Sequence, residues 1–178
     1  GEGLFYDCQN IKNITLNRNL NYDYRKEFGY SPFSGIKSNF NVTIGNDVTK
    51  IGNLLFYNSG INNITIGENV REIGACAFYN CAKLKSVTLP KNDNFKTINE
   101  RLFYHCDTLV DVTIPDSVTT IGNYAVEKCE KLTNITFDYE NSKIEIIGNS
   151  SFENCKNLES IYIPKKMTCI GDKKKKNC

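Results

Sequence analysis

The side chains of this sequence that could act as nucleophile, general base or metal ligand are above all eight cysteines and one histidine. His105 directly precedes Cys106, but a thiol is activated by a base that faces its sulfur, and adjacent residues rarely achieve that geometry. Cys76 and Cys81 form one close pair, with no second pair to complete a metal site. The sequence also lacks a glycine-rich phosphate loop, and its carboxylates are scattered. We therefore expect a protein that is not an enzyme and that has no metal and no cofactor.

The spacing of the cysteines indicates a repeat. Five of them, at positions 81, 106, 129, 155 and 178, follow one another at intervals of 23 to 26 residues. If serine takes the place of cysteine twice, the anchors extend to the start of the sequence as Cys8, Ser34, Ser59, Cys81, Cys106, Cys129, Cys155 and Cys178. These anchors predict about seven coils of 22 to 26 residues, which form a single repeat array over residues 1–178.

Each coil carries two strand signals. The clearest unit, TLVDVTIPDSVTTIGNYAVEKC at 108–129, alternates polar and apolar residues and then has a second short apolar segment before Ile-Gly. In an earlier coil, Ile64 and Ile66 are expected to point inward and Thr65 outward. The glycine after the second segment suits a turn with positive φ. The stretch before each cysteine has the length of a single 3₁₀ or helical turn.

A single coil cannot bury its apolar side, but stacked coils can do so through ladders of like residues. One expected ladder contains Ile14, Val42, Ile64, Val87, Val112, Ile135 and Ile161, and another contains Ile51, Ile73, Ile98, Ile121, Ile147 and Ile170. A third contains Phe5, Phe56, Phe78, Phe103, Val126 and Phe152. Burial of each Ile or Phe is worth about 1.5 to 3 kcal/mol, so the ladders can hold the fold without disulfides.

The repeated cysteines have three interpretations. The favoured one is a free thiol that packs as a small hydrophobe in a turn. Disulfides between adjacent coils fit the expected spacing of about 5 Å, but the side chains would run parallel instead of facing each other. Metal binding is the third alternative.

The unit LxxVTIPxSVTTIGNYAxxxC at Leu109–Cys129 resembles the BspA-type leucine-rich repeats, which are known from surface proteins of anaerobic bacteria and parasitic protozoa. The pattern recurs in about six of the seven coils. The resemblance implies a β-rich leucine-rich-repeat solenoid with right-handed coils, a parallel β-sheet on the concave face and short 3₁₀ or helical turns. It also implies adhesion or protein binding, often to host or extracellular-matrix proteins.

Two parts of the sequence depart from the pattern. Coil 10–34 keeps the repeat length without the Ile-Gly signal and is expected to be degenerate. Residues 165–178 are expected to end the array, because Lys174 and Lys175 stand where apolar residues belong and would solvate the exposed end. A nuclear or membrane-surface signal is the alternative interpretation of Lys173–Lys176. Because Gly1 matches the glycine of an Ile-Gly pair, further coils are expected upstream.

The composition excludes several classes of function. The net charge of the 178 residues is +2, whereas nucleic-acid surfaces usually carry a strong basic excess. No nucleic-acid partner is therefore expected. The apolar runs are a few residues long, too short to span a bilayer, so no membrane insertion is expected either.

Two exposed stripes are the candidate protein-binding sites. The outward residues of the first strand signals form a polar face, with Thr43, Thr65, Thr88, Asp111, Thr113, Thr136 and Tyr162 as its expected contact residues. Threonine also forms β-structure well, so a purely structural explanation stands beside the functional one. The second stripe is Tyr6, Tyr57, Tyr79 and Tyr104, each of which follows a ladder Phe and should point away from the core. Half-burial across neighbouring turns is the structural alternative for these tyrosines.

Five N-glycosylation sequons begin at Asn13, Asn41, Asn63, Asn134 and Asn149. Four of them share one repeat position, where Asn-Ile-Thr and Asn-Val-Thr also fit the strand pattern. They are thus either glycan sites, which would crowd the polar face of a secreted eukaryotic protein, or by-products of the repeat.

Together these features predict a non-enzymatic protein-binding module of a cell-surface or extracellular protein, with adhesion to a host or matrix protein as its role. The alternative is a cytoplasmic scaffold for protein–protein interactions, which unpaired thiols favour. The sequence leaves the oligomeric state open.

Overall fold

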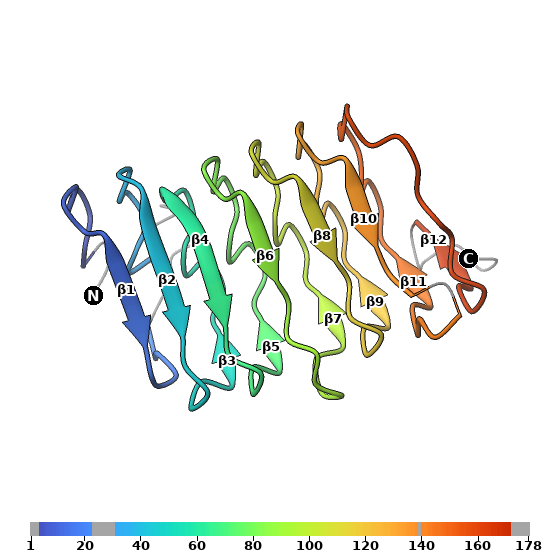
Figure 1. Cartoon of the computed structure of the whole chain (residues 1–178), viewed down its shortest axis with the longest axis horizontal. Helices are drawn as coiled ribbons and strands as arrows, with labels where there is room; N and C mark the ends of the chain where they lie inside the picture. The colour runs from blue at the N-terminus through green and yellow to red at the C-terminus, as the bar shows by residue number, and fades with distance from the viewer. Residues whose placement is uncertain (1–3, 23–30, 139, 172–178) are drawn as a thin grey trace.

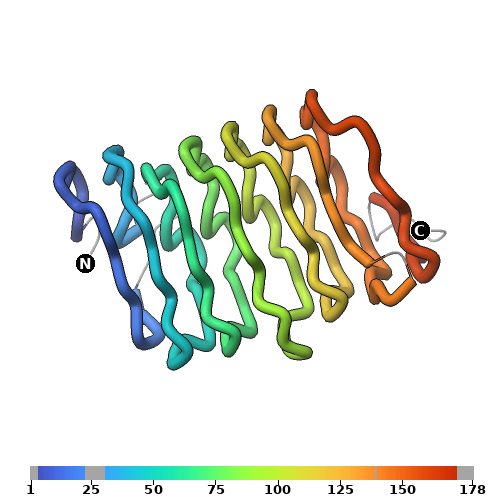
Figure 2. The backbone as a smooth tube through the Cα atoms, in the orientation of Figure 1, coloured from blue at the N-terminus to red at the C-terminus, as the bar shows by residue number. Residues whose placement is uncertain are grey.

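A computed structural model of the protein describes residues 4–22, 31–138 and 140–171. It is a parallel β-solenoid, which confirms the predicted fold class (Figure 1; Figure 2). One side of the coils is a six-stranded parallel sheet in sequence order, made of β1 (Asn13–Leu16), β2 (Phe40–Ile44), β4 (Ile61–Ile66), β6 (Ser86–Thr88), β8 (Asp111–Thr113) and β10 (Asn134–Thr136).

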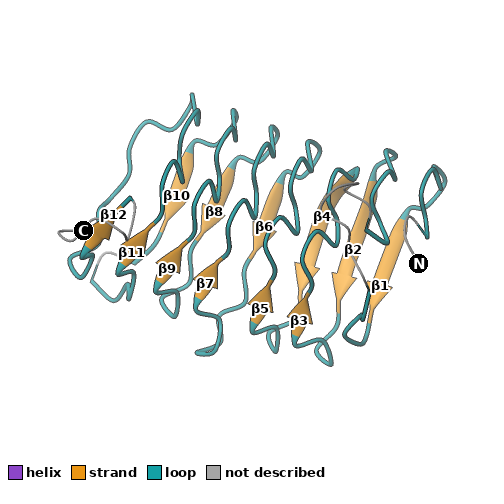
Figure 3. Ribbon diagram, turned by 180° about the vertical axis from the view of Figure 1, so that it is seen from behind, coloured by secondary structure: helices purple, strands orange, loops and turns teal. Residues whose placement is uncertain are grey.

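A second side carries two-residue strands, which lie nearer the viewer in Figure 3. Here β3 (Lys50–Ile51) pairs with β5 (Glu72–Ile73). A four-stranded sheet follows, made of β7 (Thr97–Ile98), β9 (Thr120–Ile121), β11 (Ile146–Ile147) and β12 (Cys169–Ile170).

The two-residue period of the longer strands decides which side chains enter the core. In β2, Val42 and Ile44 are buried while Asn41 and Thr43 are exposed. The first predicted ladder is buried from Val42 to Ile135, with half-buried members at its two ends. The second ladder is buried from Ile51 to Ile147, whereas its last member, Ile170, is 65% exposed. Both ladders thus form as predicted except at the ends of the array.

The phenylalanine ladder contains one residue more than the sequence pattern indicated. The rings of Phe5, Phe33, Phe56, Phe78 and Phe103 stack with centroids 5.3 to 5.7 Å apart. Phe33 lies three residues before Ile36, just as Phe78 lies three residues before Cys81. Ile36 is fully buried and therefore occupies the cysteine position of its coil. The choice of Ser34 as that anchor was wrong by two residues.

The turns before the cysteines are not helical, so the predicted 3₁₀ or helical turns are wrong. The described residues contain no helix (Figure 3). The Cys81 N–H donates to the Phe78 C=O at 3.2 Å, and Asn80 between them has φ 55°. The Phe78 N–H donates instead to the Leu102 C=O of the next coil at 3.1 Å. Positive φ interrupts a right-handed helix, and here it directs backbone groups toward the neighbouring coil.

Four of the repeated cysteines in the described part of the protein are free thiols that each also form a hydrogen bond. Cys81, Cys106 and Cys129 are completely buried, and Cys155 is half-buried. Their Sγ atoms donate to backbone carbonyl oxygens of the preceding coil, each at 3.1 Å: those of Phe56, Phe78, Phe103 and Val126. The ladder cysteines therefore donate hydrogen bonds to the backbone as well as packing as small hydrophobes. Cys169 differs, because it is disulfide-bonded.

Most of the glycines after the second strands serve close stacking, and of the five (Gly52, Gly74, Gly122, Gly148 and Gly171) only Gly171 has the predicted positive φ. Among the described glycines, only Gly35 and Gly171 have positive φ. At Gly148, an added Cβ would lie 2.6 Å from the backbone nitrogen of Asn123 in the preceding coil. Such an approach excludes a side group, so the coils can stack this tightly only where glycine stands.

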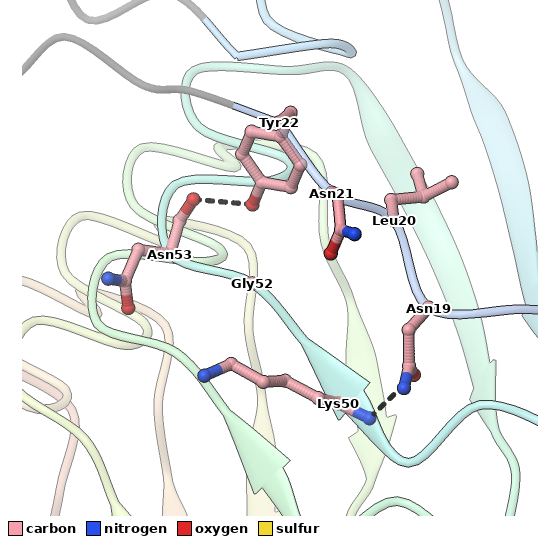
Figure 4. A pocket seen from close by; sticks show the side chains of 7 residues that line it. All are labelled: Asn19, Leu20, Asn21, Tyr22, Lys50, Gly52 and Asn53. Atoms are coloured by element: carbon pink, nitrogen blue, oxygen red, sulfur yellow. Dashed lines mark hydrogen bonds between the residues drawn. The ribbon is translucent and has the colours of Figure 1, made fainter.

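The degenerate coil 10–34 is held by a side chain that substitutes for a strand, although its residues 23–30 lie outside the described part of the protein. Asn19 Oδ1 accepts a hydrogen bond from the backbone N–H of Thr49 at 2.9 Å. It accepts a second one from the backbone N–H of Lys50 at 3.1 Å (Figure 4). In a regular coil, the Lys96 C=O accepts the two corresponding N–H groups, those of Thr119 and Thr120. The Asn19 amide thus replaces a backbone carbonyl at the edge of β3.

Tyr22 joins the same coil to the next one. Its hydroxyl donates to the Asn53 C=O at 2.6 Å (Figure 4). Asn19 and Tyr22 stand at opposite ends of a polar pocket of about 550 Å³ whose far wall is Lys50, Gly52 and Asn53. The irregular coil therefore still contacts β3 and the residues after it, but through side chains instead of a strand.

The array has six strands in its main sheet, and not the seven that seven complete coils would give. Residues 159–163 were expected to form the seventh strand but are not in a strand. Ile161 of this segment is half-buried, while Tyr162 is 69% and Ile163 is 48% exposed. The lysines at 173–176, including Lys174 and Lys175, and Cys178 lie outside the described residues.

Candidate functional site

The outward side chains of the six-stranded sheet form one polar face, which we call the strand face. It has two columns, Asn13, Asn41, Asn63, Ser86, Asp111 and Asn134 beside Thr15, Thr43, Thr65, Thr88, Thr113 and Thr136. All twelve residues are exposed. The structure therefore brings six of the seven predicted contact residues together, namely Thr43, Thr65, Thr88, Asp111, Thr113 and Thr136. Tyr162, the seventh, lies beyond β10 on the segment that leaves the sheet.

Asparagine amides in the first column bond to one another across the coils. Asn63 Nδ2 donates to Asn41 Oδ1 at 3.0 Å, and Asn41 Nδ2 donates to Asn13 Oδ1 at 3.4 Å. Asn134 Nδ2 donates locally to Thr133 Oγ1 at 3.1 Å. A glycan on these sequons would be attached at Nδ2 and would interrupt the ladder. The fifth sequon residue, Asn149, is half-buried in the turn after β11, away from the strand face.

The tyrosine stripe is a stack of three rings with one separate member. Tyr57 and Tyr79 stack with centroids 5.1 Å apart, and Tyr79 and Tyr104 with centroids 4.6 Å apart. These three side chains are half-buried, whereas Tyr6 is 59% exposed. Ser34 takes the tyrosine position in the intervening coil, because Phe33 fixes the register there. The serine separates Tyr6 from the stack.

Cationic groups cover the C-terminal end of this stack. Lys128 Nζ donates to Tyr104 Oη at 2.7 Å and lies 5.1 Å from the ring centroid. In the same region, the Arg101 guanidinium lies 4.3 Å from the Tyr124 centroid. The pKa of Tyr79 is raised, mainly because its side chain is partly buried and to a smaller extent because of the neighbouring Tyr104. The stripe is therefore a half-buried aromatic surface with adjacent cations.

His105 and Cys106 do not form a nucleophilic pair. The Cys106 thiol points into the core and donates to the Phe78 C=O, and burial raises its pKa well above the usual value. The His105 ring lies outside the core, with Nδ1 2.7 Å from Asp107 Oδ1. Its backbone has φ 60°, so this repeat position is a positive-φ turn and not merely a polar loop.

The comparisons with known proteins agree with the repeat architecture. The family described as "BspA type Leucine rich repeat region" matches the sequence in six copies, over residues 1–95 and 92–178. The chain belongs to this family. No curated protein matches the sequence.

Solved leucine-rich repeat structures resemble this BspA-type array. A leucine-rich repeat protein of T. pallidum is 25% identical, with a TM-score of 0.71 over 90% of this protein and 66% of that one. A leucine-rich cell surface protein of Faecalibacterium prausnitzii is 26% identical, with a TM-score of 0.65 over 90% of this protein and 43% of that one. The pneumococcal vaccine antigen PcpA shares the fold at 22% identity, with a TM-score of 0.50 over 94% of this protein and 38% of that one. The array thus spans less than two thirds of each of the last two structures, and 66% of the first.

The BspA-type array also has a feature that the sequence did not indicate. A pocket of about 260 Å³ lies at the C-terminal edge of the strand face, between β10 and Ser160 and Tyr162. The segment 159–163 has the same polar–apolar alternation as the other strands, so no local signal shows that it leaves the sheet.

In the part of the protein that the structure describes, no helix is long and apolar enough to cross a membrane.

Proposed function

We propose that this BspA-type array is a non-enzymatic protein-binding module of a cell-surface or secreted protein, and that it mediates adhesion to a host or extracellular-matrix protein. The observation that carries the proposal is the strand face, on which exposed polar side chains repeat in register across six strands. Solenoids commonly use such extended surfaces for partners that contact several repeats. The cell-surface protein of F. prausnitzii to which the array is similar supports the location.

Asp111 on the strand face and Tyr162 beyond its C-terminal edge are the first residues to test. Asp111 is the only charge in the two columns, and Tyr162 is a large exposed ring at their C-terminal edge. Aromatic side chains are among the residues that contribute most at interfaces. Replacement of both by alanine should weaken binding at least about tenfold, which is about 1.4 kcal/mol, while the unfolding midpoint stays unchanged.

The experiment has two stages. Intact source cells are first treated with trypsin, and released peptides of this protein are identified by mass spectrometry. Matrix proteins such as fibronectin, laminin and collagen are then immobilised and binding of the purified array is measured by surface plasmon resonance. Asp93→Ala is the matched control, because Asp93 is an exposed aspartate in a loop away from the strand face. Equal binding of the wild type and of Asp111→Ala/Tyr162→Ala would contradict the placement of the site.

A cytoplasmic scaffold that uses the same face is the second candidate. The free cysteines among the described residues, including the exposed Cys8, favour a reducing compartment. The disulfide at Cys169 favours the opposite. Release of peptides only after lysis of the cells would support the scaffold and redirect the search to cytosolic partners.

A further inference from the structure

The outer edge of β10 carries backbone groups that the repeat elsewhere pairs with another strand. On β8, the Val110 C=O accepts a hydrogen bond from the Thr133 N–H at 2.9 Å, and the Ile114 N–H donates to the Thr136 C=O at 2.8 Å. One coil later, the equivalent groups are the Thr133 C=O and the Phe137 N–H. Neither has a hydrogen-bond partner among residues 4–22, 31–138 and 140–171. An open edge of this kind is a template for another strand.

The segment that should cover this edge does not pair with it, although its Leu158 and Ile161 pack against the core. No backbone hydrogen bond joins β10 to the described residues 158–163. In Figure 1 the backbone between β11 and β12, drawn in red, swings away from β10 on its way to β12. The space between them is the pocket of about 260 Å³, with Asn134, Thr136 and Phe137 on one wall and Ser160 and Tyr162 on the other. The repeat has therefore left a slot at the position of its seventh strand.

We propose that this slot binds an extended segment of the protein partner, which adds to the main sheet as a parallel strand beside β10. The inference rests on the proposed function of the array as a protein-binding module, and it names the kind of segment that is bound. The Thr133 C=O and the Phe137 N–H are placed for an extended backbone, because β8 meets β10 through the same two repeat positions, the Val110 C=O and the Ile114 N–H. Backbone pairing of this type supplies affinity in β-strand addition, and alternate side-chain positions supply specificity.

The surroundings of the slot define the sequence that it accepts. Ile135 and Phe137 are buried at its inner side, at 7% and 9% exposure, and Asn134 and Thr136 are exposed at its outer side. A bound segment should therefore alternate apolar residues that face the core with polar residues that join the strand face. β8 and its flanking residues, Leu109–Asp116, have this alternation and fit the same two-sided environment one coil earlier.

The test uses a synthetic, fluorescein-labelled peptide with the sequence of residues 109–116, LVDVTIPD, and the purified array. Fluorescence anisotropy should show saturable binding of this peptide and none of a scrambled peptide of equal composition. A peptide with N-methyl groups on alternate backbone nitrogens, chosen to face β10, should bind at least tenfold more weakly. Hydrogen exchange of the Phe137 amide should slow when the unmodified peptide is bound.

A matched pair of variants shows where the peptide binds. Ser160→Trp fills the slot, whereas Ser86→Trp places the same ring at the same repeat position on β6, which has a strand on each side. Both serines are exposed, so both variants should keep the wild-type unfolding midpoint. Ser160→Trp should weaken peptide binding at least tenfold, and Ser86→Trp should not.

Three results would overturn the slot. The first is that the peptide does not bind the wild-type array, and the second is that it binds both tryptophan variants equally well. The third is that size-exclusion chromatography shows a dimer of the array, and that the β10 edge becomes exposed only when this dimer dissociates. The proposed function has a separate test. Suppose that a matrix protein no longer binds the Asp111→Ala/Tyr162→Ala variant but still binds the Ser160→Trp variant. The strand face is then the binding site and the slot is not. If neither variant loses that protein, the proposed placement of the site fails as well.

Discussion

Raising the pH from 7 to 9.5 should destabilise the array through its buried thiols. Burial raises the pKa of the Cys81 thiol from its usual 9.0 to about 12, and it raises the pKa values of Cys106 and Cys129 well above 9.0. In the unfolded state the same thiols ionise near pH 9. The unfolded state therefore binds fewer protons above that pH, and the stability that is present below pH 9 is lost as the pH rises toward the folded pKa values.

The size of this effect follows from proton linkage. Consider a thiol that has a pKa of 9.0 in the unfolded state and stays protonated in the folded state. Its contribution to the free energy of unfolding falls by about 0.8 kcal/mol between pH 7 and pH 9.5. The three fully buried thiols together should lose about 2.5 kcal/mol over the same interval. Tyrosines and lysines also begin to titrate in this range, so the thiol contribution has to be isolated by comparison of variants.

The assay is urea unfolding followed by circular dichroism at pH 7 and at pH 9.5, with a non-thiol reductant present. Cys106→Ala should lose about 0.8 kcal/mol less than the wild type between the two pH values. Phe78→Ala is the control, because it destabilises the same region without removing a thiol, and its pH-dependent loss should equal that of the wild type. If Cys106→Ala and the wild type show the same loss, the Cys106 thiol is not held protonated by burial and the reasoning fails.

Two further predictions concern the stability of the stack. Phe78 is completely buried between Phe56 and Phe103, so Phe78→Ala should lower the free energy of unfolding by about 3 to 5 kcal/mol. Phe152→Ala, at a half-buried position, should lower it by less. Equal shifts of the urea midpoint for the two variants would contradict the ladder. Asn19→Ala removes the acceptor of two backbone N–H groups of β3 and should cost about 1 to 3 kcal/mol. Asn19→Asp keeps an oxygen acceptor and should cost less, and equal midpoints for the two Asn19 variants would show that the amide does not replace a strand.

The interior of the array was largely predictable from the sequence, because its period directly determines its geometry. Alternation within a strand decides which side group faces inward, so the ladders through Ile64 and Ile73 and the exposure of Thr65 followed from spacing. The recurrence of cysteine predicted the coil length. Six of the seven predicted contact residues lie on one face for the same reason, since equivalent positions of a solenoid stack.

The turns were predicted wrongly, because backbone conformation there depends on the next coil. The stretch before each cysteine has helical length, but the N–H groups of Phe78 and its equivalents find their acceptors in the neighbouring coil. The glycines show the same limit, because the steric contact that excludes a side group at Gly148 is with Asn123, 25 positions earlier in the sequence. Such requirements exist only after the coils have stacked.

The sequence by itself determined the repeat, the inward ladders and the composition of the strand face, because these depend on periodicity within each coil. The tertiary structure alone decided which residue fills each repeat position in the irregular coil, how Asn19 replaces a strand, and that the main sheet ends at β10. These features depend on pairing between coils, where one backbone group must meet a partner more than twenty residues away. The open edge of β10 belongs to this second group, since residues 159–163 have a strand-forming sequence and yet leave the sheet.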